Sequence, residues 1–144
     1  MINLSDYREY WERVADRLDS VTGVLPVAVD KDMGKRIQAL PTGSVTLFVL
    51  PPGGESDCKN PDAFREVNQC VVFVMEKYDP QRKTSFSALE SSQRAIEDVK
   101  ALMLDDLAAG CPVMRFDVST LNTLPETEFF AGFAGWSIGF KIMT

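Results

Sequence analysis

The sequence predicts a single α+β domain over residues 1–144, a mostly antiparallel β-sheet with two main amphipathic helices packed on one face. Three observations predict this class. Two segments, 5–22 and 87–109, repeat apolar residues with the period of an α-helix. Several shorter segments alternate, or run apolar, as strands do. The helices bracket the strands instead of alternating with each of them, which favours an α+β arrangement over a parallel α/β fold.

The first helix is expected to begin at Ser5, since a hydroxyl side chain there is suited to an N-cap, and to end before Gly23. Asp6 in its first turn would face the positive end of the helix dipole. One face is apolar and rich in aromatic residues: Tyr7, Tyr10, Trp11, Val14, Leu18 and Val21. Such a stripe predicts a helix that packs on the core; the alternative is a surface for a partner.

Two apolar strands are predicted at 45–50 and 68–78, and both faces of the first are expected to be at least partly buried. Between them, residues 51–67 show no periodicity and start with two prolines and two glycines. We therefore expect a long loop, and loops of this length are usually functional or disordered. Its candidate interaction residues are Asp57, Lys59, Phe64 and Arg65.

The second helix has the clearest boundary signals, a capping box from Ser87 to Glu90 and a stop at Gly110. An alternating segment at 113–118 predicts a strand, and 121–128 a polar turn. The last ten residues, 135–144, alternate again, with large apolar residues on one side at Trp136, Ile138, Phe140 and Ile142. Burial of these side chains is worth ~6–12 kcal/mol in total, at ~1.5–3 kcal/mol each. That is comparable with the net stability of a domain, so the terminal strand is expected in the core.

The run that leads into this strand, FFAGFAGW, holds Phe129, Phe130 and Phe133. Small residues between large rings let the chain bend, or let another backbone approach closely. One interpretation places the three rings in a satellite cluster beneath the sheet edge. The other makes them an exposed apolar patch, which on a soluble protein marks a subunit contact. We name them as candidate interaction residues.

No catalytic motif, cofactor site or metal site is predicted. Histidine is absent, which removes the usual general base and the usual metal ligand. The three cysteines are far apart and form no C-x-x-C pair. The glycines at 53–54 lack the Lys-Ser/Thr of a phosphate-binding loop, and the paired acids at 105–106 and at 126 and 128 are expected to be solvated. We therefore expect a protein that is not an enzyme.

The net charge and the hydropathy of the chain limit the kinds of partner that we expect. The net charge of −6 and the lack of a basic run argue against sequence-specific binding of nucleic acid. The longest apolar runs are far too short for a membrane span, and no secretory signal opens the chain. A cytoplasmic protein is expected.

The order of the segments resembles a known family. An amphipathic N-terminal helix is followed by the strands VTLFVL and CVVFVMEKY, the helix SALESSQRAIEDVKALMLDDL and the closing strand GWSIGFKIMT. This order, over most of the chain, resembles the tail terminator (tail completion) and related head–tail joining proteins of tailed phages and prophages. The resemblance implies a homo-oligomeric ring, typically a hexamer, that caps the tail tube and joins it to the head. It also implies other tail or head–tail proteins as partners, and a location in the host cytoplasm, the virion or both.

Ring subunits need two different surfaces that meet head to tail. The loop 51–67 and the run 129–136 are the two candidates. The alternative function is a small non-catalytic α+β binding domain, with a small molecule or protein partner in an apolar groove lined by Tyr7 and Trp11. An enzyme, the third class, needs carboxylates brought together from distant segments, such as Asp79 and Glu90.

Overall fold

The computed structural model describes residues 1–28, 31–127 and 131–144, and it confirms the α+β class. Short 3₁₀ turns lie at Pro61–Ala63 and Val118–Thr120. The helices are α1 (Leu4–Arg17), α2 (Met33–Gln38) and α3 (Ser85–Ala108). The strands are β1 (Gly23–Pro26), β2 (Val45–Val49), β3 (Gly53–Ser56), β4 (Glu66–Lys77), β5 (Asn122–Glu126) and β6 (Phe133–Met143).

The strands form one sheet in the order β1-β2-β4-β6-β5, and β3 pairs with β4 beyond the end of β2. The β1–β2 pair is parallel, and the other described pairs are antiparallel. β4 and β6 pair along their whole length, from Val67–Met143 to Lys77–Phe133. The terminal strand therefore lies in the middle of the sheet, as its apolar alternation predicts.

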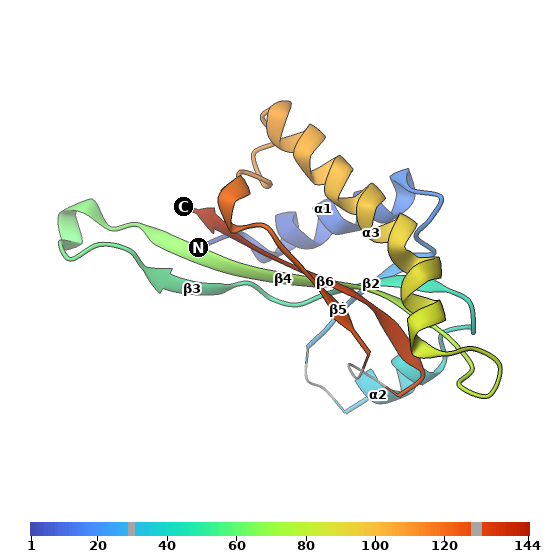
Figure 1. Cartoon of the computed structure of the whole chain (residues 1–144). Coiled ribbons are helices and arrows are strands. Elements are labelled where there is room, and N and C mark those ends of the chain that lie inside the picture. The colour runs from blue at the N-terminus through green and yellow to red at the C-terminus, as the bar shows by residue number, and fades with distance from the viewer. Residues whose placement is uncertain (29–30, 128–130) are drawn as a thin grey trace.

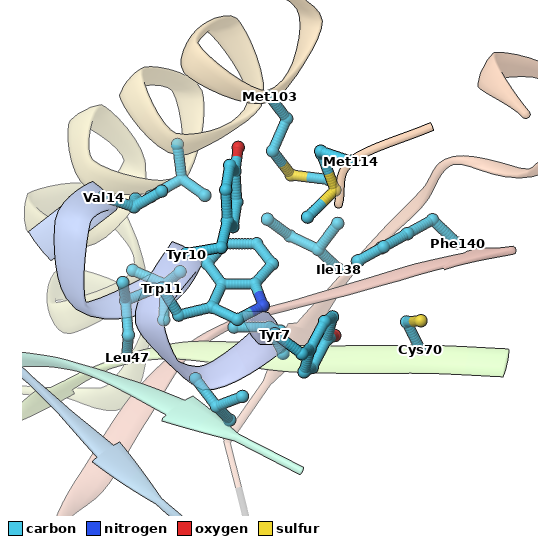
Figure 2. Close-up of a cluster of buried hydrophobic side chains, with 14 of the residues drawn as sticks. Tyr7, Tyr10, Trp11, Val14, Leu47, Cys70, Met103, Met114, Ile138 and Phe140 are labelled. Carbon is cyan, nitrogen blue, oxygen red and sulfur yellow. The ribbon is translucent and has the colours of Figure 1, made fainter. Parts of the chain in front are cut away.

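Helices α1 and α3 lie over one face of the sheet (Figure 1). The main core forms between them and the even-numbered side chains of β4 and β6. Trp11 is fully buried at its centre, with the ring of Tyr10 edge-on at 5.1 Å and that of Phe140 tilted at 6.3 Å (Figure 2). Burial of this aromatic stripe is the main force that holds α1 on the sheet.

A second, smaller core lies on the other face, beneath the short helix α2. Met33 and Ile37 of α2 pack there on Phe48, Met75 and Phe133. The rings of Phe48 and Phe133 meet edge to face at 5.7 Å. This second core explains why every residue of β2 is buried, as its uninterrupted apolar run predicts.

The helix boundaries differ from the expected ones at three helix ends, which are the starts of α1 and α3 and the end of α1. Asn3, not Ser5, caps α1, because its side chain accepts the Asp6 N–H at 3.1 Å. Thr84, not Ser87, caps α3 in the same way. In each case a polar residue a few positions upstream takes the cap and adds a turn or part of one to the helix. At the other end, α1 stops at Arg17, and Gly23 opens β1.

The segment 113–128 was also predicted wrongly. Residues 113–118 form no strand beyond a single bridge from Phe116 to Ile142. The polar stretch after it contains β5, which pairs with β6 from Asn122–Gly139 to Glu126–Gly135. β5 has no apolar alternation because it lies at the edge and is mostly exposed, so its pairing with β6 alone defines it as a strand.

Candidate interaction surface

Residues 51–67 form a β-hairpin arm instead of the predicted loop (Figure 1). β3 pairs with β4 from Gly53–Gln69 to Ser56–Glu66, and the Asp57 N–H continues the ladder with a bond to the Arg65 carbonyl. On the other side of β4, the last neighbour is Thr144, which exchanges two backbone hydrogen bonds with Glu66. Residues 57–65, called the arm tip below, extend beyond this point.

The arm tip has a defined conformation. The Asn60 side chain accepts the Asp62 N–H at 3.1 Å and caps the 3₁₀ turn. The Arg65 N–H donates to the Cys58 sulfur at 3.2 Å, across the mouth of the turn. These bonds hold Phe64 at the end of the arm with 61% of its surface exposed. A large ring on an ordered, projecting element is a feature that the protein's own core does not use.

The four residues predicted from this segment lie together. Asp57, Lys59, Phe64 and Arg65 are all exposed, and all belong to the arm tip. The tip therefore combines one large apolar side chain with charges of both signs. Such a mixture is typical of a site where the ring is buried against a partner and the charges surround it.

The aromatic run divides differently. Phe129 and Phe130 lie outside the described residues. Phe133 is fully buried in the second core, so its prediction as an interaction residue was wrong, and the satellite-cluster interpretation holds for it. Trp136, assigned to the core, is half-buried, and its indole N–H donates to the Leu89 carbonyl at 3.3 Å. Gly135 permits the close approach expected in this run, because a Cβ there would lie 2.8 Å from the Met75 Cα.

The sequence reasoning missed an uncovered part of the sheet. On the face opposite α1 and α3, beyond the reach of α2, Val71, Leu124 and Met143 are between 37% and 51% exposed. Their strands place them on one face, because Val71 pairs with Gly139, Leu124 with Ser137 and Met143 with Val67. The alternation of apolar residues in β6 places Met143 opposite the core-facing side chains, and this could be read from the sequence. That Val71 and Leu124 share the same face follows only from the register of β4 and β5 with β6.

Asp106, one member of the acidic pair at 105–106, holds the two long helices together. Asp106 accepts the Tyr10 hydroxyl at 2.8 Å and both end nitrogens of Arg17 at 3.1–3.2 Å. Burial, and then the bond to Asp106, raise the pKa of the Tyr10 hydroxyl far above its ordinary value. Asp105 is exposed, as expected, but Asp106 is not the solvated group that the sequence predicted. Its role is to join α1 to α3.

A second polar cluster lies where β4 meets α3. The Lys83 ammonium lies 2.8 Å from the Glu76 carboxylate and 2.7 Å from the Ser91 hydroxyl, which also donates to Glu76. A serine beside a lysine suggests a nucleophile and its base. However, an ammonium group in an ion pair has no lone pair with which to accept a proton. The cluster ties the start of α3 to the sheet.

The groove of the alternative function is shallow. A depression of about 190 Å³ lies between the first turns of α1 and the ends of β1 and β2, and Tyr7 lines it. Trp11 does not, since it is fully buried. The Tyr7 hydroxyl and the Trp11 indole N–H are buried without a hydrogen-bond partner among the described residues. Burial is the main reason why the pKa of Tyr7 is well above its ordinary value.

The two carboxylates named for an enzyme have different surroundings. Asp79 accepts the Gln81 N–H and lies 3.7 Å from Arg82, and Glu90 is exposed on α3. Within residues 1–28, 31–127 and 131–144, no group of acids and cysteines is arranged to hold a metal ion. None of the described helices has the length and apolar character needed to cross a membrane.

Comparison with known proteins adds no family. No family model matches the chain, and no curated protein shows significant similarity to it.

Proposed function

We propose that this protein is a structural subunit of a phage or prophage-like tail, a tail terminator or head–tail joining protein that acts by assembling into a ring. The observation that carries the proposal is the ordered arm with the exposed Phe64 at its tip. The order of helices and strands, which resembles that family, supplies the identity of the assembly.

Energy favours a partner for the arm. Full burial of a phenylalanine side chain contributes about 1.5–3 kcal/mol, and Phe64 has most of that contribution still to gain. The hydrogen bonds within the tip already fix its backbone, so a partner that covers it loses little conformational entropy on binding. A preformed, mostly exposed aromatic tip is therefore suited to contact a neighbouring subunit.

A ring also needs a second, different surface. The uncovered sheet face around Val71, Leu124 and Met143 belongs to β4, β5 and β6, and at its Met143 end it adjoins the base of the arm, where Met143 and Asp57 line one depression. The two surfaces are not copies of one another, so contact between them is head to tail. Head-to-tail contact closes into a ring when the rotation between subunits permits it.

The charge supports the same proposal. Proteins that hold DNA through its phosphates use clustered lysine and arginine side chains. This chain has a net charge of −6, and its sequence contains no run of basic residues. A ring of these subunits would surround DNA without binding it tightly, as a connector between head and tail requires.

The depression beside Tyr7 favours a ligand-binding function less strongly. Its volume of about 190 Å³ lies below the ~300–1,000 Å³ that is usual for small-molecule pockets.

The test is the solution mass by light scattering over a hundredfold range of concentration, with electron microscopy of any large species. We expect a discrete ring-sized species for the natural chain and a shift to monomer for Phe64→Asp. Phe86→Asp is the matched control, because Phe86 is 69% exposed on α3, away from the arm. A monomer at every concentration would refute the proposal, and so would an equal effect of the two variants.

A further inference from the structure

We infer that neighbouring copies join by strand addition, in which the outer edge of β5 in one copy pairs with the outer edge of β3 in the next. The inference rests on the proposed ring and names the surfaces that form it. Its basis is the set of backbone N–H and carbonyl groups that point outward from the edges of the sheet.

β3 presents a complete set of backbone groups to solvent. Glu66 bonds to Thr144 on the β6 side, so its partner on β3, Ser56, directs its own N–H and carbonyl away from β4. The same alternation places the groups of Gly54 outward, whereas Asp57 bonds inward to Arg65. All of β3 is exposed, and no backbone bond to Gly54 or Ser56 on this side occurs among the described residues. An open edge without proline is a template for another strand.

β5 presents a matching but incomplete set. The Lys141 carbonyl accepts the Asp117 N–H on the side away from β4, so the odd residues of β6 bond toward β5. The partners of Gly139 and Ser137, which are Asn122 and Leu124, therefore bond inward. Thr123 and Pro125 face outward. This edge offers an N–H and a carbonyl at Thr123 but only a carbonyl at Pro125.

Because Pro125 has no N–H, the outer edge of β5 can pair well only with a strand that supplies the donors itself. Two β5 edges would face each other with a proline on both sides, which removes donors from each strand. The edge of β3 has both donors that β5 needs, at Gly54 and Ser56. At the other end of the sheet, β1 ends at Pro26 and packs against α1. β3 is therefore the best partner for β5 within the described sheet.

The directions of the strands agree with this pairing. β3 and β6 run one way, and β4 and β5 run the other, because each neighbouring pair is antiparallel. In a sheet that continues from one copy to the next, β5 therefore meets β3 antiparallel. β5 lies opposite residues 71–75 of β4 and β3 opposite residues 66–69, so this pairing shifts neighbouring copies along the strands, and a closed ring needs an axis inclined to the strands, as in a β-barrel. The two edges lie on opposite sides of the β4–β6 pair, which makes the contact head to tail.

One register uses the available groups. With Thr123 opposite Ser56, those two residues exchange both backbone bonds, and the Gly54 N–H donates to the Pro125 carbonyl. Glu55 and Leu124 then lie opposite each other as a non-hydrogen-bonded pair. Both side chains project from the uncovered face of the sheet, because Glu55 pairs with Val67 and Leu124 with Ser137.

The first test removes one outward donor. Ser56→Pro deletes the outward N–H and leaves every bond to β4 in place, while Ser56→Ala, the matched control, keeps that N–H. We expect Ser56→Pro to weaken association at least tenfold, with an unchanged circular dichroism spectrum, and Ser56→Ala to associate as the natural chain does. Equal association of both variants, with the fold intact, would overturn the inference.

The second test does not depend on affinity. In a background that carries Cys58→Ser and Cys111→Ser, the pair Glu55→Cys and Leu124→Cys places two Cβ atoms ~4.5–5.5 Å apart across the contact. That is close enough for a disulfide after small adjustment. Oxidation should give a ladder of covalent multimers. A covalent dimer from Glu55→Cys alone would instead indicate a symmetric β3–β3 contact and overturn the inference. A ring-sized natural chain without the ladder would overturn the inference but not the proposed function, whereas a natural chain that stays monomeric would overturn both.

Discussion

The terminal strand allows a quantitative test of the fold at Phe140. This side chain is 3% exposed, edge to face with Phe116 at 5.6 Å and tilted against Trp11 at 6.3 Å. Replacement of a buried phenylalanine by alanine destabilises a protein by about 3–5 kcal/mol. The aromatic pairing supplies ~0.5–1.5 kcal/mol of this loss. Since a domain of this kind has a net stability of about 5–15 kcal/mol, Phe140→Ala removes a large part of it.

The assay is urea unfolding followed by tryptophan fluorescence, which reports on Trp11 beside the mutated site. With a urea slope of about 2 kcal/mol per molar, a loss of about 4 kcal/mol lowers the midpoint by about 2 M. The control is Lys141→Ala, one residue along the same strand but exposed on the other face, which is expected to change stability by less than about 0.5 kcal/mol. If Phe140→Ala left the midpoint in place, or Lys141→Ala lowered it equally, the assignment of the two faces of β6 would be refuted.

Three further predictions concern buried polar groups. Tyr10→Phe and Asp106→Asn should be coupled by ~0.5–3 kcal/mol in a double-mutant unfolding cycle, and additive losses would contradict the clamp between α1 and α3. Asn68→Ala should destabilise by about 1–3 kcal/mol in urea, because the Ile2 N–H loses the amide oxygen that accepts it, and an unchanged midpoint would contradict that role. Burial raises the pKa of Cys70 from 9.0 to about 11, so the folded state keeps a proton that the unfolded chain releases. Stability should therefore fall as pH rises from 9.0 to about 11, and Cys70→Ala should remove that part of the slope, as measured by unfolding at each pH.

Prediction from the sequence succeeded where burial on one face makes apolar residues recur with the period of a helix or a strand. The stripe from Tyr7 to Val14 predicts the face of α1 that packs on the sheet, and the alternation from Trp136 to Ile142 predicts the inner face of β6. The fully apolar run of β2 predicts burial on both sides, although the helix that covers its second face was not foreseen. In each case the signal comes from apolar area removed from water, which is the largest favourable contribution to folding.

It failed where pairing alone defines the structure. β3 consists of Gly53-Gly54-Glu55-Ser56, which has low strand propensity and is exposed on both faces, so no pattern distinguishes it from a loop. β5 includes a proline, which indicates a turn when the partner strand is unknown. Both are held by long-range hydrogen bonds to β4 and β6. The arm tip residues were predicted as part of an interaction surface, and that stays a prediction; their exposure and their common position followed only from the structure.

The position of the terminal strand explains how a thin arm is held firmly on the body. β6 contributes its even side chains to the main core, and at its end Thr144 pairs with Glu66, the first residue of β4 beyond the arm tip. Two residues further along β4, Asn68 is completely buried, and its side chain bonds to the Ile2 N–H, the Ile142 carbonyl and the Thr144 hydroxyl. The base of the arm is therefore fixed by residues from both ends of the described chain. A load on the arm tip would therefore pass to β4 and β6, which suits the contact between subunits that we propose.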